Sequence, residues 1–250
     1  MQGTRCWIDF AAGDSQAYEG ALGRYHELVK WLAEHGAKYG LLGTLDELDD
    51  TGREMLTAVY EGDTKISLQP CDLSPPPSLL LPRLSFTVSS APGLKKTVAN
   101  FLALLTDEKK LASKRPPNAP LRYKGSRVFR IEEGFVAQTG DVTRQDGCGG
   151  ESIYGGSFND EKDGLKVPFE LGTIAMANSG KNSNTSQFFV TLTFDSAKLK
   201  KLTGRYVAFG QADVEDVDTK RCFERLNQLA DGKGGTTVPV WVEDCNVVQE

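Results

Sequence analysis

Apolar and polar residues recur with two different periods along this chain. Over residues 15–36 apolar side chains return at intervals of three and four, which predicts an amphipathic helix. A second helix is predicted to begin at Thr44, because Thr44 and Glu47 have the spacing of a capping box. Residues 62–81 contain three consecutive prolines and predict an extended connector. The first part of the chain is therefore expected to form a helical hairpin followed by a connector.

Elsewhere the period is close to two residues, which is typical of β-strands. Segments of this kind are short and separated by glycine-rich loops, and two further stretches have helical spacing. Many short strands with few helices favour a mainly β fold, a closed antiparallel barrel, over a parallel α/β sheet. The predicted strands span residues 6–11, 83–89, 127–131, 135–138, 173–176, 187–192, 206–210 and 238–248, and the predicted helices span 94–105 and 219–230.

One predicted strand carries two adjacent phenylalanines that must point in opposite directions. In NSNTSQFFV, residues 182–190, Phe188 shares a face with Val190, and Phe189 shares the other face with Gln187. If Phe188 belongs to the core, Phe189 is presented to something else.

A second strand, RVFRI at residues 127–131, places Phe129 and Ile131 on one face and leaves Arg130 with Val128 on the other. The two strands and the loops beside them offer arginine, glutamine, asparagine and phenylalanine, without a carboxylate pair or a nucleophile–base couple. Such a set suits binding, or a reaction without covalent chemistry such as rotation about an X-Pro bond. A guanidinium group there would stabilise the twisted amide more than either planar form.

Composition and charge narrow the classes of function. The 250 residues carry a net charge of −5, so no basic field indicates a nucleic-acid partner. No apolar run approaches the length that spans a bilayer, which gives no support for membrane association. The N-terminus lacks a secretory pattern, so we expect a cytoplasmic protein.

Cysteine and histidine usage gives no sign of a metal centre. The five cysteines are odd in number and include no C-x-x-C pair, which argues against a disulfide framework and a zinc site. His26 and His35, the only histidines, lie in the first fifth of the chain, and we expect neither a metal nor a cofactor. Cys148, within DGCGG, is either an inert loop thiol or a redox-sensitive one.

Three segments follow one another in the second half of the chain: YKGSRVFRIEEGFVAQTGDVTRQDGCGGESIYGGSF at residues 123–158, GTIAMANSGKNSNTSQFFVTL at 172–192 and GRYVAFG at 204–210. Together they resemble the cyclophilins, peptidyl-prolyl cis-trans isomerases that bind cyclosporin. The resemblance implies a single cyclophilin-like domain over residues 1–250, an eight-stranded antiparallel β-barrel capped by two helices. Its core would be residues 4–11 and 82–250. Residues 12–81, the helical hairpin and the Pro-rich connector, would be inserted between strands one and two.

The resemblance also implies a role for individual residues. Proline-containing peptides and proteins would be the substrates, and a specificity pocket would accept the side chain two residues before the proline. The catalytic residues would be Arg130, Phe135, Gln138, Asn178 and Phe189. The other substrate-binding residues would be Val136, Ala177, Gln187, Leu202 and Tyr206. The specificity pocket would be bordered by Gly156, Ser157, Ser179, Ser183 and Thr185.

Several positions depart from the usual family pattern. Val136 stands where methionine is common, and a smaller pocket wall should be tolerated. Lys201 replaces a tryptophan that contacts cyclosporin, so we expect weak cyclosporin binding. Tyr206 replaces a histidine at the pocket edge, which keeps a ring for packing and leaves the level of activity open. Residues 109–120 lengthen a loop, and their basic side chains form either a solvated surface or an anion site.

Two functions fit this sequence. The first is a peptidyl-prolyl cis-trans isomerase, or rotamase, that accelerates X-Pro rotation in peptides and folding proteins by non-covalent stabilisation of the transition state. The alternative is a weakly active or inactive proline-binding scaffold that recruits a protein partner through residues 12–81. The apolar stripes of this insertion are explained either by packing within the protein or by such a partner surface.

Overall fold

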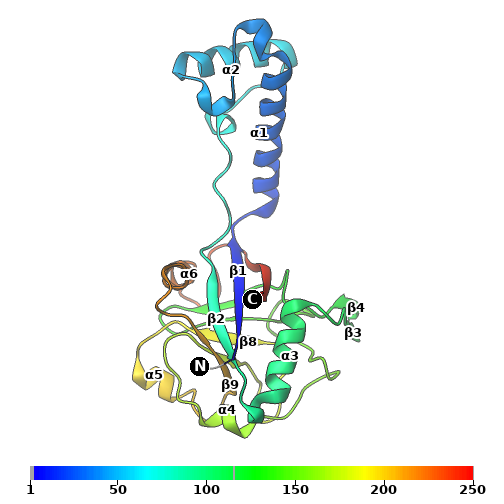
Figure 1. The fold of residues 1–250 in the computed structure, drawn as a ribbon, viewed down its shortest axis with the longest axis vertical. Coiled ribbons are helices and arrows are strands. Elements are labelled where there is room, and N and C mark those ends of the chain that lie inside the picture. The colour runs from blue at the N-terminus through cyan, green and yellow to red at the C-terminus, as the bar shows by residue number, and fades with distance from the viewer. Residues whose placement is uncertain (1–2, 115, 250) are drawn as a thin grey trace. The chain divides into compact units, whose positions relative to one another are not determined.

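The computed structural model describes residues 3–114 and 116–249, which divide into two compact units. One unit is formed by Met1–Gly13 together with Leu80–Glu250, and the other by Asp14–Leu79. Figure 1 shows the elements of both units. Each unit has its own cluster of buried apolar side chains. None of the helices in the described residues is long and apolar enough to cross a membrane.

The larger unit is built on an eight-stranded antiparallel sheet that curls into a barrel-like form. The strand order is β10-β1-β2-β9-β7-β8-β6-β5. This arrangement confirms the fold expected from the sequence, including helices α1 (Ser15–His35) and α2 (Asp50–Thr64) between β1 and β2. The strands are β1 (Gly3–Ala12), β2 (Leu84–Ser89), β5 (Arg130–Glu132), β6 (Val136–Thr139), β7 (Thr173–Met176), β8 (Phe188–Thr191), β9 (Ala208–Ala212) and β10 (Val240–Val247).

The residues just before β5 join the two edges of this sheet. Val128 donates its backbone N–H to the carbonyl of Val240 at 2.9 Å, and Val242 donates to the carbonyl of Ser126 at 2.9 Å. An antiparallel bridge between residues 127 and 241 lies between these two bonds. Because β10 also pairs with β1, the first and last strands lie side by side.

The same segment corrects the predicted pattern of side chains. Val128 and Ile131 are both buried in the core, whereas Phe129 is only partly buried. Strict alternation fails because residues 126–128 meet β10 through isolated bonds, and regular strand structure begins only at Arg130. The expected grouping of Phe129 with Ile131 is therefore wrong, although Arg130 does point away from the core.

Two helices complete the core of the larger unit. They are α3 (Lys95–Thr106) and α6 (Val217–Gln228), which lie on either side of β1 and β2 in the view of Figure 1. The ring of Phe101 on α3 packs edge-on against Phe188 at a centroid distance of 5.1 Å. Phe223 and Leu226 of α6 belong to the same apolar cluster. These are the two capping helices that the sequence predicted.

Several short elements lack a sequence pattern long enough to predict them. The lengthened loop contains a two-stranded sheet of β3 (Ala112–Lys114) and β4 (Pro117–Pro120). Arg115, one of its basic residues, lies outside the described residues. Two five-residue helices, α4 (Lys162–Lys166) and α5 (Ser196–Lys200), flank the functional site described below.

The smaller unit is the expected helical hairpin of α1 (Ser15–His35) and α2 (Asp50–Thr64). The apolar stripes of the two helices pack against each other, and the Trp31 ring meets the Tyr60 ring edge-on at 5.3 Å. Fully or nearly fully buried side chains come from both helices and the turn between them: Leu28, Leu32, Leu41, Leu45, Leu56 and Tyr60.

Helix α2 begins later than the sequence predicted. The capping box of Thr44 and Glu47 is present, but it caps a 3-10 helix at Leu45–Glu47. Asp49 caps α2 instead, because its carboxylate accepts the N–H of Gly52 at 2.8 Å.

The connector after α2 is not extended throughout, contrary to expectation. Helix α2 continues to Thr64, and a 3-10 helix spans Pro70–Leu73. Asp72 in this helix is buried and pairs with Arg24 of α1 at 2.9 Å, so the connector folds back onto the hairpin.

Candidate active site

Alternation along the central strands divides their side chains between two apolar clusters. Phe188 and Val190 face the barrel interior, whereas Phe189 belongs to a second cluster on the opposite face of the sheet. Ala175 of β7 and Val136 of β6 join Phe189 there. The two adjacent phenylalanines thus serve opposite faces, as their positions in the strand predicted.

Four residues form a row across neighbouring strands on this second face. The strand register pairs Arg130 with Gln138, Gln138 with Phe189, and Phe189 with Ala175. Paired residues of adjacent strands lie opposite each other on one face of a sheet. The register therefore brings a guanidinium, an amide and an aromatic ring together from distant parts of the sequence.

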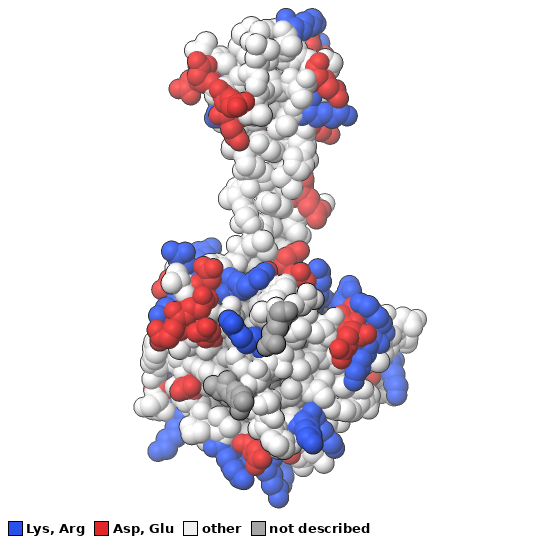
Figure 2. Space-filling view, viewed as in Figure 1, with Lys and Arg blue, Asp and Glu red and all other residues white. Residues whose placement is uncertain are grey.

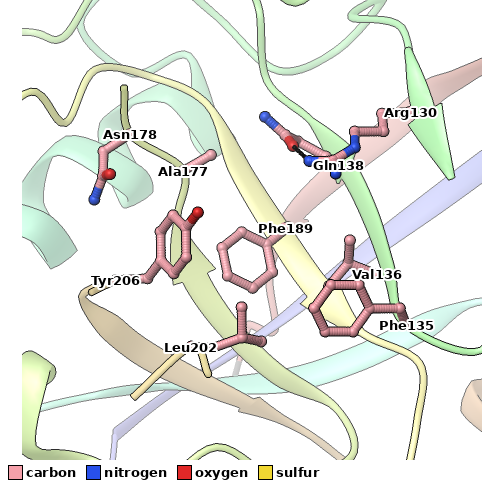
Figure 3. Close-up of a pocket in the computed structure, with 9 residues that line it drawn as sticks. All are labelled: Arg130, Phe135, Val136, Gln138, Ala177, Asn178, Phe189, Leu202 and Tyr206. Carbon is pink, nitrogen blue, oxygen red and sulfur yellow. Dashed lines mark hydrogen bonds between the residues drawn. The ribbon is translucent and has the colours of Figure 1, made fainter. Parts of the chain in front are cut away.

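Nine of the ten residues predicted to be catalytic or substrate-binding line one cavity of about 160 Å³. Figure 3 shows the apolar side chains at its centre, with Arg130 and Gln138 on one side and Asn178 on the other. We call this cavity the proline pocket, after the residue that the sequence predicts it to bind. Its lining residues are Arg130, Phe135, Val136, Gln138, Ala177, Asn178, Phe189, Leu202 and Tyr206.

Aromatic rings fix the base of the proline pocket. The Phe189 ring stacks on Phe169 with a centroid distance of 6.1 Å, and Tyr206 meets it edge-on at 5.2 Å. Tyr206 therefore supplies the ring packing expected of it. Sequence reasoning missed Phe169, whose only signal was the apolar run Val-Pro-Phe at residues 167–169 outside any periodic segment.

The polar edge of the pocket is a chain of hydrogen bonds that begins at Arg130. The guanidinium donates from Nη1 to Gln138 Oε1 at 3.3 Å, and Gln138 Nε2 donates to Gln187 Oε1 at 2.9 Å. Arg130 Nη2 also forms an ion pair with Glu132, two residues along the same strand. Sequence reasoning missed Glu132, although i and i+2 positions of a strand share a face. The Arg130 side chain is 44% exposed, so its charge stands at the open mouth of the pocket.

The side chain of Asn178 holds two loops at the opposite edge. Its Nδ2 donates to the carbonyl of Arg205 at 3.1 Å, and its Oδ1 accepts the N–H of Gly180 at 3.2 Å. The side-chain amide thus supports the wall of the pocket through contacts with the protein itself.

A second cavity of about 270 Å³ adjoins the proline pocket and contains part of the predicted specificity pocket. Ser179, Ser183 and Thr185 line it, together with Gln187. Gly156 instead lines a separate hollow beside Lys114 and Glu151, and Ser157 lines neither. The structure therefore brings together three of the five residues predicted for this pocket.

A loop that sequence reasoning missed closes the second cavity. Gly147, Cys148 and Gly149 line it, and Gln187 Nε2 donates to the carbonyls of Gly147 at 3.0 Å and Gly149 at 2.7 Å. Gly147 has a φ of 86°, and a Cβ there would lie 2.6 Å from the Phe129 ring, so glycine is required. Cys148 at the tip of this loop is exposed.

Asp141 organises the same loop from within. Its buried carboxylate accepts backbone N–H groups from Arg144, Gly149, Thr143 and Gly147 at 2.9 to 3.2 Å. Burial alone would raise the pKa of Asp141, but these four donors outweigh it and lower the pKa below its usual value. The ionised carboxylate is therefore the form that holds the loop.

Among the described residues, no group of three or more His, Cys, Asp and Glu side chains is placed to hold a metal ion. The chemistry at hand is that of one guanidinium, several amides and an apolar pocket.

Comparison with known families gives a match over most of the larger unit. The family model described as "Cyclophilin type peptidyl-prolyl cis-trans isomerase/CLD" matches residues 88–247, which is more than half of the chain. All the predicted site residues lie within this span, and residues 1–87 lie outside it. The barrel-like sheet, the two capping helices and the match agree, and the chain belongs to the cyclophilin-type peptidyl-prolyl cis-trans isomerase family.

Proposed function

We propose that this protein is an active peptidyl-prolyl cis-trans isomerase that accelerates X-Pro rotation in peptides and folding proteins. The observation that carries the proposal is the position of the Arg130 guanidinium beside an apolar pocket based on Phe189. Membership of the family supports this function, and the geometry suggests how these residues would perform it.

Rotation about the X-Pro bond is slow because the amide must lose its resonance, at a barrier of about 18–20 kcal/mol. In the twisted transition state the prolyl nitrogen becomes pyramidal and gains a lone pair. The apolar pocket would hold the proline ring while the Arg130 guanidinium donates to this nitrogen or to the neighbouring carbonyl oxygen. Gln138 would keep the guanidinium turned towards the pocket.

The free energy that this mechanism requires is modest. A thousandfold to millionfold acceleration needs about 4–8 kcal/mol of binding that is stronger in the transition state than in the ground state. Loss of one preorganised donor to such a transition state typically costs about 100-fold to 1,000-fold in rate. One guanidinium donor together with a pocket that fixes the proline ring can therefore supply a transition-state stabilisation of the required size.

Exchange spectroscopy by NMR tests this proposal directly. A short Ala-Pro peptide with a substoichiometric amount of the protein should show exchange between its cis and trans forms. The Arg130→Ala variant should lose this exchange. An absence of acceleration by the wild-type protein, relative to peptide alone, would refute the isomerase proposal.

A second candidate function rests on the smaller unit. Asp14–Leu79 has its own apolar cluster, and Leu42, Met55 and Ile66 are exposed on its surface. These features favour a recruitment role for residues 12–81, either beside the enzymatic activity or instead of it. Pull-downs with the full chain and with a variant that replaces residues 12–81 by a short turn would test it. Recovery of the same proteins by both would exclude recruitment by the insertion.

We further propose that cyclosporin binds weakly, because Lys201 stands where the family usually has tryptophan. Lys201 is exposed at the C-terminal end of α5, where Leu199 and Leu202 beside it are buried against the pocket cluster. Calorimetric titration should show tighter cyclosporin binding by Lys201→Trp than by the wild type. A submicromolar dissociation constant for the wild type would contradict the proposal.

A further inference from the structure

A large open groove adjoins the proline pocket on the side away from Arg130. Its volume is about 940 Å³, within the range of ligand-binding clefts. Asn178 and Tyr206 line both the groove and the proline pocket, so the two form one continuous surface. The groove is lined by Asn159, Asp160, Lys162, Leu165, Asn178, Ser179, Gly180, Lys181, Asn182, Gly204, Arg205 and Tyr206.

The charges in this groove are predominantly positive. Lys162, Lys181 and Arg205 contribute three cationic side chains, all exposed. Among the described residues, none of the three forms an ion pair. Figure 2 shows basic side chains at the end of the larger unit where Figure 1 places α4. The groove therefore has cations to offer to a ligand.

The acidic side chains in and beside the groove have hydrogen-bond or ion-pair partners within the protein. Asp160, the one carboxylate in the lining, accepts from Asn182 N at 2.9 Å and from Asn184 Nδ2 at 2.8 Å. The Glu161 carboxylate accepts two backbone N–H groups at the start of α3, and Asp163 pairs with Lys166 at 3.3 Å. Neutral N–H donors do not cancel the charge of a carboxylate, but the groove lining itself holds three cationic side chains and one carboxylate, so positive charge predominates there.

The groove is structurally tied to the pocket through Asn178. Because Asn178 Nδ2 donates to the carbonyl of Arg205, the backbone that carries one groove cation is fixed to the pocket wall. Tyr206 follows Arg205 directly and packs on Phe189 at the pocket base. A peptide with its proline in the pocket would pass within a residue or two of these cations.

We propose that the groove binds an anionic side chain, a carboxylate or a phosphate, carried by a substrate residue next to the proline. The substrates would then be acidic X-Pro segments, a preference that rests on the proposed isomerase function. The groove would contribute mainly to affinity, because a charge outside the reacting amide is bound equally in the planar and twisted states.

Peptides with a single variable residue test this inference on the full-length protein. Four peptides would carry Gln, Glu, phosphoserine or Lys directly before the proline, and a second set would carry them directly after it. NMR titration would give each dissociation constant, and NMR exchange would give kcat/KM. In one of the two sets, we expect Glu or phosphoserine to bind about fivefold or more tightly than Gln, and Lys to bind more weakly than Gln. The advantage should shrink as salt is added.

Variants of the groove separate this effect from the chemistry of the pocket. Replacing Lys162 and Lys181 together by Gln leaves Arg205 as the one cation of the groove lining, so it should strongly reduce the preference for acidic peptides and leave the Gln peptide unchanged in kcat/KM. The matched control replaces Lys109 and Lys233 by Gln. These two exposed lysines lie outside the groove, so this variant should keep the preference for acidic peptides.

The possible outcomes distinguish the groove from the isomerase proposal. Tighter binding of the phosphoserine peptide alone, relative to the Gln peptide, would assign the groove to phosphate. Tighter binding of both the Glu and the phosphoserine peptides would assign it to acidic side chains in general. If Gln and Glu peptides are bound and isomerised equally, and phosphoserine gives no gain, the groove inference fails while the isomerase proposal stands. If no peptide is isomerised but acidic peptides bind preferentially and need Lys162 and Lys181, the isomerase proposal fails alone. A preference that is undiminished in the groove variant would overturn the inference.

Discussion

Arg130 on β5 and Gln138 on β6 are direct partners in the antiparallel register, and the guanidinium donates to the Gln138 amide at 3.3 Å. Gln138 in turn donates to Gln187, whose amide holds the loop around Cys148. One short chain of contacts thus connects the guanidinium at the proline pocket to the neighbouring cavity.

Replacement of Gln138 by Ala should lower kcat/KM for an Ala-Pro peptide by about tenfold. The variant removes a hydrogen bond that orients a charged donor, and such bonds contribute about 1.5–3 kcal/mol. Steady-state isomerisation measured by NMR exchange checks this prediction. The control is Gln16→Ala, an exposed site on α1, which should retain wild-type activity. Unchanged activity in Gln138→Ala would show that the guanidinium needs no such support.

The ion pair between Arg130 and Glu132 should restrain catalysis. Because Glu132 shares the guanidinium with any substrate, Glu132→Gln is expected to raise kcat/KM by up to about fivefold, the range of a half-exposed ion pair. Glu133→Gln makes the same charge change at the adjacent exposed residue and should have little effect. A fall in kcat/KM for Glu132→Gln would instead identify Glu132 as a residue that positions Arg130.

The order of residues in the strand was sufficient to predict that Phe188 and Phe189 point to opposite faces, because the side-chain period of a strand is two. The family resemblance was needed to tell which of them faces the pocket. The family resemblance then identified most of the proline pocket. Alternation failed at Val128 and Phe129, where isolated bonds to β10 replace regular strand structure. A sequence pattern reports local geometry, and these bonds join residues far apart in the chain.

Contacts between distant segments also explain what was missed around the second cavity. Gly147, Cys148 and Gly149 have no periodic pattern, and they line the cavity because Asp141 and Gln187 bind their backbone groups. The start of α2 was misplaced for a related reason. Thr44 and Glu47 have the correct spacing for a cap, but the backbone becomes extended at Leu48, which ends the short 3-10 helix before Asp49 caps the longer helix.

Asp141→Asn should destabilise the loop and the unit that contains it. The folded-state pKa of Asp141 is lowered, so its contribution is complete above the unfolded-state value near 4 and is lost as the pH falls through the folded-state pKa. At about pH 6 the variant should lose on the order of 3 kcal/mol, because neutral Asn cannot accept all four N–H groups. Urea unfolding would show the difference from wild type shrinking as the pH is lowered towards about 3. A difference that does not depend on pH would contradict the role of the ionised carboxylate.

The thiols should fall into two classes of reactivity. Burial raises the pKa of Cys6, Cys222 and Cys245 to about 12, whereas Cys71 and Cys148 are exposed. Since the thiolate is the reactive form, a thiol reagent at about pH 7.5 should label Cys71 and Cys148 in the native protein and the other three only after unfolding. Peptide mapping by mass spectrometry would identify the labelled sites. Rapid labelling of Cys222 in the native protein would show that the core around α6 opens readily.

The role assigned to Arg130 is tested most directly by cis–trans exchange of an Ala-Pro peptide, measured together with its dissociation constant. Wild-type protein should accelerate exchange, and Arg130→Ala should lower the catalysed rate by about 100-fold or more, the usual cost of losing a preorganised donor. The variant should still bind the peptide, because the apolar pocket around Phe189 remains intact. Equal rates for wild type and Arg130→Ala, or no acceleration by the wild type, would contradict catalysis by this guanidinium.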